Sequence, residues 1–171
     1  RGSHDGYQTI GVNYGRTIYY FSGDFFLILD EFEGERAHEF YQNFQGNYSL
    51  EDTPMIARAN LANASGLDII QLGNQISNAK ISGNKGKNRI TFQSISANKH
   101  RFTTIIKPYG KYEDRTSLPK SDGTMTVGEW QINEGSSQVM EDSYVAEYIF
   151  KKDEMTFLVG SWKSNPSEKR K

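Results

Sequence analysis

Two runs of consecutive apolar and aromatic residues stand close together near the amino terminus, Ile18–Phe21 and Phe25–Leu29. Only residues 22–24 separate them, and the glycine among these tolerates the positive φ angle of a tight hairpin. Both runs are apolar at every position, a pattern that suits a central strand covered on both faces or a buried helical segment. Their short length and the β-rich composition favour strands, so we predict a hairpin with strands Thr17–Phe21 and Phe25–Phe32.

Alternating patterns predict further strands along the rest of the chain. Residues 33–36 are expected to form a turn, and the following strand, His38–Gln45, should place Phe40, Gln42 and Phe44 on one face. A long surface loop is predicted over residues 110–123. The other predicted strands are Met55–Leu61, Leu67–Leu72, Ala79–Ser82, Arg89–Ile95, Lys99–Tyr109, Val127–Ile132, Gln138–Met140, Ser143–Phe150 and Met155–Trp162.

The spacing of these segments predicts the fold class. About ten short strands with no convincing long helix indicate an all-β antiparallel sandwich with little or no helix. The high content of aromatic residues (10 Tyr, 10 Phe and 2 Trp) agrees, because aromatic side chains favour pleated surfaces. We expect one domain over residues 5–165. Residues 1–4 resemble the remnant of an expression tag, and residues 166–171 form a basic tail expected to fray.

Composition narrows the classes of function. Lys and Arg total 20 and Asp and Glu total 21, so the net charge is close to zero, whereas duplex nucleic acid requires clustered positive charge. The basic cluster of the tail, Lys169–Lys171, is interpreted as a solvated end. No apolar run approaches the roughly 20 residues of a membrane helix. The chain has no cysteine, which removes disulfides, thiolate metal sites and cysteine nucleophiles. We therefore expect neither a nucleic-acid partner nor a membrane span.

The histidines outside the tag remnant, His38 and His100, do not suggest a metal site. They lie far apart in the sequence, and His38 and Glu39 point to opposite faces of a strand. We interpret His38 mainly as a hydrogen-bonded strand residue, with a binding surface or a catalytic role as alternatives. Residues 83–87, GNKGK, echo a phosphate loop but lack the following Ser or Thr and the helix, and predict a turn. No cofactor and no metal are expected.

A cluster of carboxylates follows the second apolar run. Asp30, Glu31 and Glu33 could supply the paired carboxylates of a glycosidase. If the hairpin turns at Gly23, however, Arg16 falls opposite residues 29–31. We therefore favour a structural charge pair of Arg16 with Asp30 and Glu31 over a catalytic pair.

The aromatic residues of the loop region are the remaining candidates for a binding site. Tyr109, Tyr112 and Trp130 have flat rings that could stack on sugar faces, and His38 could join such a surface. Packing in the core, or fastening a loop, is the alternative that we favour for these aromatic residues.

Three segments resemble a known family. Residues 16–34 read RTIYYFSGDFFLILDEFEG, residues 37–44 read AHEFYQNF, and Arg101–Tyr109 reads RFTTIIKPY. These segments, about a quarter of the chain, resemble strands in the carboxy-terminal β-sandwich of the heparinase II/III-like polysaccharide lyases. The shared features are an Arg opening an apolar strand, a Gly-Asp turn, and an aromatic strand that closes on Asp.

The resemblance implies a parent enzyme that cleaves uronic-acid-containing polysaccharides by β-elimination. In the family, Tyr and His act as base and acid, chiefly on an α/α-toroid domain that precedes the sandwich, and some members bind zinc at the start of the sandwich. No position here matches these residues, so no catalytic residue is assigned. Gln45 stands where relatives often carry His, so the role of that His is not assigned to this chain.

The resemblance therefore predicts a non-catalytic accessory domain. Its expected partners are a missing amino-terminal catalytic domain and, through the parent enzyme, an acidic polysaccharide such as heparan sulfate or alginate. A periplasmic or secreted bacterial protein is implied. The alternatives are a free-standing carbohydrate-binding or interaction sandwich and, third, a complete small enzyme.

Overall fold

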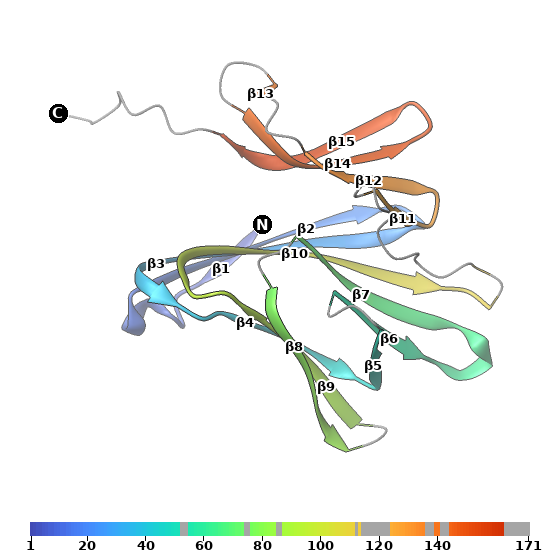
Figure 1. The fold of residues 1–171 in the computed structure, drawn as a ribbon, viewed down its shortest axis with the longest axis horizontal. Coiled ribbons are helices and arrows are strands. Elements are labelled where there is room, and N and C mark those ends of the chain that lie inside the picture. The colour runs from blue at the N-terminus through green and yellow to red at the C-terminus, as the bar shows by residue number, and fades with distance from the viewer. Residues whose placement is uncertain are drawn as a thin grey trace. The chain divides into compact units, whose positions relative to one another are not determined.

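The computed structural model of the chain describes residues 1–51, 55–73, 76–84, 87–111, 113, 124–135, 139–140 and 144–162, and shows a fold made almost entirely of strands (Figure 1). Two short 3-10 turns, η1 (Gln8–Ile10) and η2 (Ala62–Ala64), are the helical elements of this part of the chain. The chain divides into two compact units, Arg1–Glu113 and Asp114–Lys171, each described by itself below. The predicted all-β class is confirmed.

The amino-terminal unit is a sandwich of two antiparallel sheets. The larger has seven strands in the order β1-β2-β3-β10-β7-β6-β5, and the smaller has three in the order β4-β9-β8 (Figure 1). The strands of the larger sheet are β1 (Gly2–His4), β2 (Val12–Phe21), β3 (Phe25–His38), β5 (Tyr48–Leu50), β6 (Ile56–Asn60), β7 (Gly66–Leu72) and β10 (Ala97–Tyr109). Those of the smaller are β4 (Tyr41–Gly46), β8 (Ile76–Asn84) and β9 (Lys87–Ser94).

The core of this unit lies between the two sheets. Residues from both pack together, including Phe32 and Phe102 from the larger sheet and Phe40, Ile90 and Phe92 from the other side. The opposite face of the larger sheet also carries buried apolar residues, namely Phe25, Leu27, Leu29, Ile70 and Ile105. The central strands of the larger sheet are therefore apolar on both faces.

The predicted hairpin is present, and its two strands differ in burial. β2 and β3 pair from Val12↔Gly34 to Phe21↔Phe25 around residues 22–24. β3 lies between β2 and β10 and is buried at every position of Leu27–Asp30, so the expected coverage on both faces is confirmed for this strand. For β2 that expectation is wrong, because Ile18 and Tyr20 are 55% and 62% exposed.

Two boundaries differ from the expectation. Residues 33–36 continue β3 instead of forming a turn, so β3 runs without a break to His38. The segment predicted as one strand over His38–Gln45 is therefore shared between the end of β3 and β4. The faces within it are as predicted, since Phe40 and Gln42 are buried and Tyr41 is 51% exposed.

The carboxy-terminal unit is a smaller antiparallel sheet. Its order is β11-β12-β14-β13, with β15 pairing with β14. The strands are β11 (Met125–Val127), β12 (Trp130–Glu134), β13 (Val139–Met140), β14 (Tyr144–Lys152) and β15 (Met155–Trp162). The predicted terminal hairpin is present as β14 and β15, which close at Lys152↔Met155. No helix in the described residues is long and apolar enough to span a membrane.

Candidate functional site

The carboxylate of Asp30 is a buried polar group with several hydrogen-bond donors around it. β3 directs this side chain toward the smaller sheet, where its residue is only 1% exposed. Arg16, directly opposite on β2, donates from Nε to Oδ1 and from Nη2 to Oδ2, both at 2.6 Å. Tyr14 donates its hydroxyl to Oδ1 at 2.8 Å, and Gln42 donates Nε2 to Oδ2 at 2.8 Å. These four bonds supply the partners that a buried carboxylate requires.

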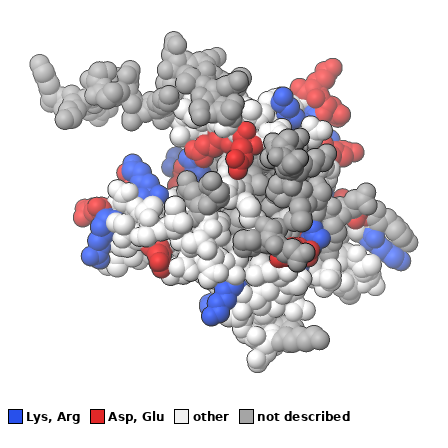
Figure 2. Space-filling model, in the orientation of Figure 1, with Lys and Arg blue, Asp and Glu red and all other residues white. Residues whose placement is uncertain are grey.

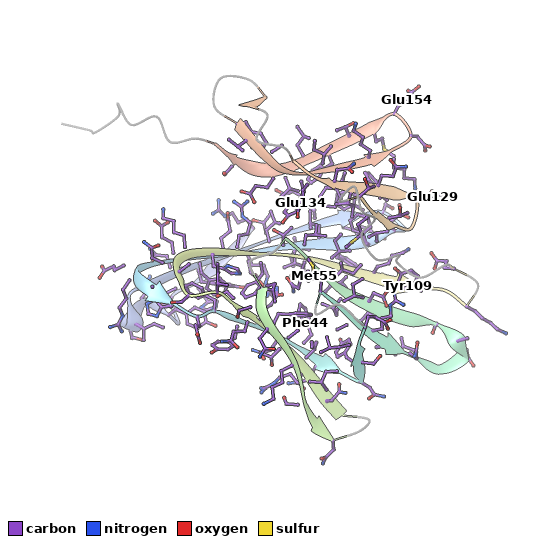
Figure 3. All side chains as sticks on the ribbon, in the orientation of Figure 1. Phe44, Met55, Tyr109, Glu129, Glu134 and Glu154 are labelled. Carbon is purple, nitrogen blue, oxygen red and sulfur yellow. The ribbon has the colours of Figure 1, made fainter. Side chains whose placement is uncertain are left out.

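Gln42 extends this network across the larger sheet. It comes from β4, on the same face as Phe44, which is labelled in Figure 3 and packs against the core. The Gln42 carbonyl oxygen accepts bonds from Gln71 Nε2 at 2.6 Å and from Thr104 Oγ1 at 2.9 Å. The hydroxyl of Thr104 also lies 3.2 Å from Gln71 Oε1. Five strands (β2, β3, β4, β7 and β10) thus meet in one chain of polar side chains, which we call the Asp30 network.

The electrostatics of the Asp30 network favour a structural role. The hydrogen bonds to Asp30 raise the pKa of Arg16. Burial, with the neighbouring Asp30 carboxylate second, raises the pKa of Tyr14 to about 12. A tyrosine held so firmly in its protonated form is unsuited to act as a base at neutral pH.

Glu31 belongs to a different environment from Asp30. Successive side chains of a strand point to opposite faces, and Glu31 accepts hydrogen bonds from Arg101 of β10, with Nη2–Oε1 at 2.8 Å. Arg1 Nη2 lies 3.6 Å from Glu31 Oε2. The structure therefore pairs Arg16 with Asp30, and it pairs Glu31 with Arg101 and Arg1. Sequence reasoning missed Tyr14, Gln42, Gln71 and Thr104 as members of the network.

Both histidines contact the same aromatic ring. The centroid of Phe40 lies 6.0 Å from that of His38 and 6.2 Å from that of His100. His100 is 5% exposed, neither of its ring nitrogens has a hydrogen-bond partner in the described part of the chain, and burial lowers its pKa to about 4. The described residues contain no group of three or more His, Asp or Glu side chains placed to hold a metal.

Two of the predicted sugar-contact aromatics, Tyr109 and Trp130, lie at buried positions. Tyr109, labelled in Figure 3, and Trp130 are only 4% and 6% exposed. Lys107 Nζ lies 5.2 Å from the centroid of the Tyr109 ring and 3.1 Å from Glu113 Oε1. Tyr112 lies outside the described residues. His38 is half-buried. A role for these four residues in sugar contact stays a prediction.

An exposed aromatic surface that the sequence pattern did not reveal lies beside Arg16. Ile18, Tyr20 and Phe26 are 55%, 62% and 40% exposed. Ile18 and Tyr20 share one face of β2, and the rings of Tyr20 and Phe26, on paired positions, stack with centroids 4.9 Å apart. We call these three residues the β2 apolar surface. In the sequence, this surface corresponds to the unbroken apolar run Ile18–Phe21, a pattern that predicts a strand covered on both faces.

On the face drawn in Figure 2, the charged side chains of the described residues are of mixed sign. Figure 2 shows Lys and Arg interspersed with Asp and Glu over the coloured residues of the face that it presents. Several of these charges are paired, such as Lys99 with Glu33 at 2.6 Å and Lys152 with Glu129 at 2.7 Å. Recognition of a polyanion through a broad basic surface has no support on this face.

Comparison with known proteins relates the fold to polysaccharide lyases. No family model and no curated protein matches the chain. The heparan sulfate lyase HepC from Pedobacter heparinus matches with a TM-score of 0.62 at 14% identity, over 95% of this chain and 25% of that one. A heparinase III, the BT4657 gene product, matches with a TM-score of 0.60 at 13% identity, over 94% and 25%. The chain thus shares the fold of a segment that makes up a quarter of these lyases.

Proposed function

We propose that this chain is the accessory β-sandwich of a polysaccharide lyase and has no catalytic activity alone. The observation that carries the proposal is the coverage of the structural comparison. Nearly the whole chain aligns with heparan sulfate lyases, whereas three quarters of those lyases have no counterpart here. The strand motifs of residues 16–44 and 101–109 resemble the same family.

The side chains of the described residues support a non-catalytic role. An elimination needs a base and an acid converging on the sugar within hydrogen-bond reach. The half-buried Tyr14 donates its hydroxyl to Asp30, and the buried His100 lies against the rings of Phe40 and Phe102, so both groups are engaged within the sandwich. The parent enzyme would supply these groups from its amino-terminal catalytic domain, and would bind the acidic polysaccharide there.

The β2 apolar surface supports a packed partner. Exposed apolar residues that cluster on one face are typical of interaction sites. Ile18, Tyr20 and Phe26 form such a cluster at the edge of the larger sheet. We propose that the catalytic domain of the parent enzyme packs on this surface. Because polysaccharides of this class lie outside cells, we also propose a periplasmic or secreted bacterial protein.

Activity assays of the isolated chain and of its parent protein test this function. Each protein would be incubated with heparan sulfate and with alginate, and unsaturated product would be followed by its ultraviolet absorbance. We expect product from the parent protein on at least one substrate, and none from the isolated chain. Release of product by the isolated chain would overturn the accessory role, and an inactive parent would overturn the lyase assignment.

A second candidate function is carbohydrate binding by the isolated sandwich, favoured by the stacked and exposed rings of Tyr20 and Phe26. Affinity electrophoresis in gels containing heparan sulfate or alginate tests it. If this function holds, the chain is retarded and Tyr20→Ala relieves the retardation. Tyr41→Ala is the matched control, because Tyr41 is 51% exposed on the smaller sheet.

A further inference from the structure

Among the described strands, β1 covers only part of the outer edge of β2. β1 pairs with β2 through Gly2↔Arg16, Ser3↔Gly15 and His4↔Tyr14. β2 continues to Phe21, and in that stretch β3 is the one described strand that neighbours it. Alternate backbone groups of an edge strand point away from its partner, which makes the edge a template for another strand.

The side chains along this part of β2 do not protect the edge. Natural edge strands are commonly guarded by charged residues, proline or a bulge. Thr17–Phe21 contains no charged residue and no proline, and its pairing with β3 is regular. Ile18 and Tyr20 are instead exposed and apolar. A strand added here would also cover part of the β2 apolar surface.

The direction of β1 indicates where such a strand would come from. β1 and β2 are antiparallel, so each residue further toward the amino terminus of β1 pairs with a residue further toward the carboxy terminus of β2. Continued without a bulge, this register puts position 1 opposite Thr17. The fifth residue upstream of Asp5 in a longer chain then lies opposite Ile18, and the seventh lies opposite Tyr20.

Resting on the proposed function, we propose that the segment joining the catalytic domain to this sandwich adds to β2 as a strand that continues β1 along Thr17–Phe21. The residues of β1 are Gly, Ser and His, which carry no aliphatic side chain; its pairing comes from the main chain, with one ring contact between His4 and Tyr14 at 4.6 Å. Residues 1–4 resemble a tag remnant, and the natural residues at these positions can pair with β2 through the main chain in the same way. The added strand ties the orientation of the sandwich to that of the catalytic domain.

Cysteine pairs in the parent protein test the register, in a background without other cysteines. Ile18→Cys is combined with cysteine at the fifth residue upstream of Asp5, and Tyr20→Cys with cysteine at the seventh. Both pairs are expected to form a disulfide on mild oxidation, measured by mass spectrometry of proteolytic fragments. The control combines either substitution with cysteine at the sixth residue, which a period-two strand directs to the opposite face. Equal crosslinking of matched and control pairs would overturn the proposal.

Hydrogen exchange gives a second readout that needs no substitution. We expect the amides of Thr17–Phe21 that point away from β3 to exchange at least about tenfold more slowly in the parent protein than in the isolated chain. Equal exchange would overturn the proposal, as would an Ile18→Cys crosslink between two copies of the parent. An inactive parent with matched crosslinks would overturn only the proposed function. An active parent without them would overturn only this inference.

Discussion

Arg16 and Asp30 lie directly opposite each other on β2 and β3, and two hydrogen bonds of 2.6 Å join the guanidinium to both carboxylate oxygens. Asp30 is almost fully buried, whereas the Arg16 side chain is 42% exposed. The pair therefore links the Asp30 network in the core to the margin of the β2 apolar surface. It stabilises the hairpin and positions that surface.

Replacing Asp30 tests how much the network contributes to stability. In Asp30→Ala, Arg16, Tyr14 and Gln42 lose a shared acceptor, so we expect the free energy of unfolding in urea to fall by about 3 kcal/mol. Glu31→Ala is the control, because Glu31 is 38% exposed and its loss should cost less than about 1 kcal/mol. Similar costs for the two variants would contradict a structural role of the buried network.

The buried imidazole of His100 predicts a pH dependence. Its pKa is lowered to about 4 in the folded state, against 6.5 ordinarily, so the unfolded chain binds the proton first. The His100 contribution to stability is therefore complete above pH 6.5 and is lost as the pH falls toward 4. We expect the wild type to lose up to about 1.4 kcal/mol per pH unit there, relative to His100→Phe.

Urea unfolding at several pH values measures this difference. His4→Phe is the control, because it makes the same substitution at an exposed histidine. A difference in stability between wild type and His100→Phe that stayed constant between pH 4 and pH 6.5 would contradict the assignment.

Phe25 and Phe26 are adjacent in sequence but should respond differently to truncation. Phe25 is 0% exposed and stacks on Phe21 with centroids 4.4 Å apart, whereas Phe26 is 40% exposed. We expect Phe25→Ala to lower the free energy of unfolding by about 3–5 kcal/mol. Phe26→Ala should cost about 1 kcal/mol or less. Chemical denaturation of the isolated chain measures both variants. Equal losses of unfolding free energy would contradict the difference in burial between the two faces of β3.

Gly160 should not tolerate a side chain. It pairs with Ala146 beside the irregularity in register between β14 and β15, and an added Cβ would overlap the backbone oxygen of Val145. Because the obstacle is backbone, we expect Gly160→Ala to destabilise the hairpin by about 1–3 kcal/mol. Faster hydrogen exchange in β14 and β15 would report it.

Gly15→Ala is the matched control for Gly160→Ala. Gly15 also lies in a strand, but its Cβ would meet only the end of the Arg1 side chain at 3.8 Å. Its stability should stay within about 0.5 kcal/mol of the wild type. A Gly160→Ala variant with the exchange rates of Gly15→Ala would show that the backbone there moves apart easily.

The alternation of side chains along single strands was accessible from sequence, because it depends only on neighbouring residues. It placed Phe40 and Gln42 together on one face, whereas the predicted charge pair of Arg16 with both Asp30 and Glu31 needed the structure to separate the two carboxylates. Alternation could not reveal that Gly34 lies inside a long strand, since glycine suits a turn as well as a close approach. A Cβ at Gly34 would lie 3.2 Å from both Val12 Cγ2 and the backbone oxygen of Arg36, which leaves little space for a side chain.

The sequence by itself determined the all-β class and the central hairpin, since both follow from local periodicity and turn residues. Only the tertiary structure decided which strands are neighbours. β10 lies between β3 and β7, which brings Thr104 and Gln71 to Gln42 although they are distant in sequence. It also decided that β2 lies near an edge with Ile18 and Tyr20 exposed. Strand order is set by packing between distant segments, and no local pattern along the chain encodes it.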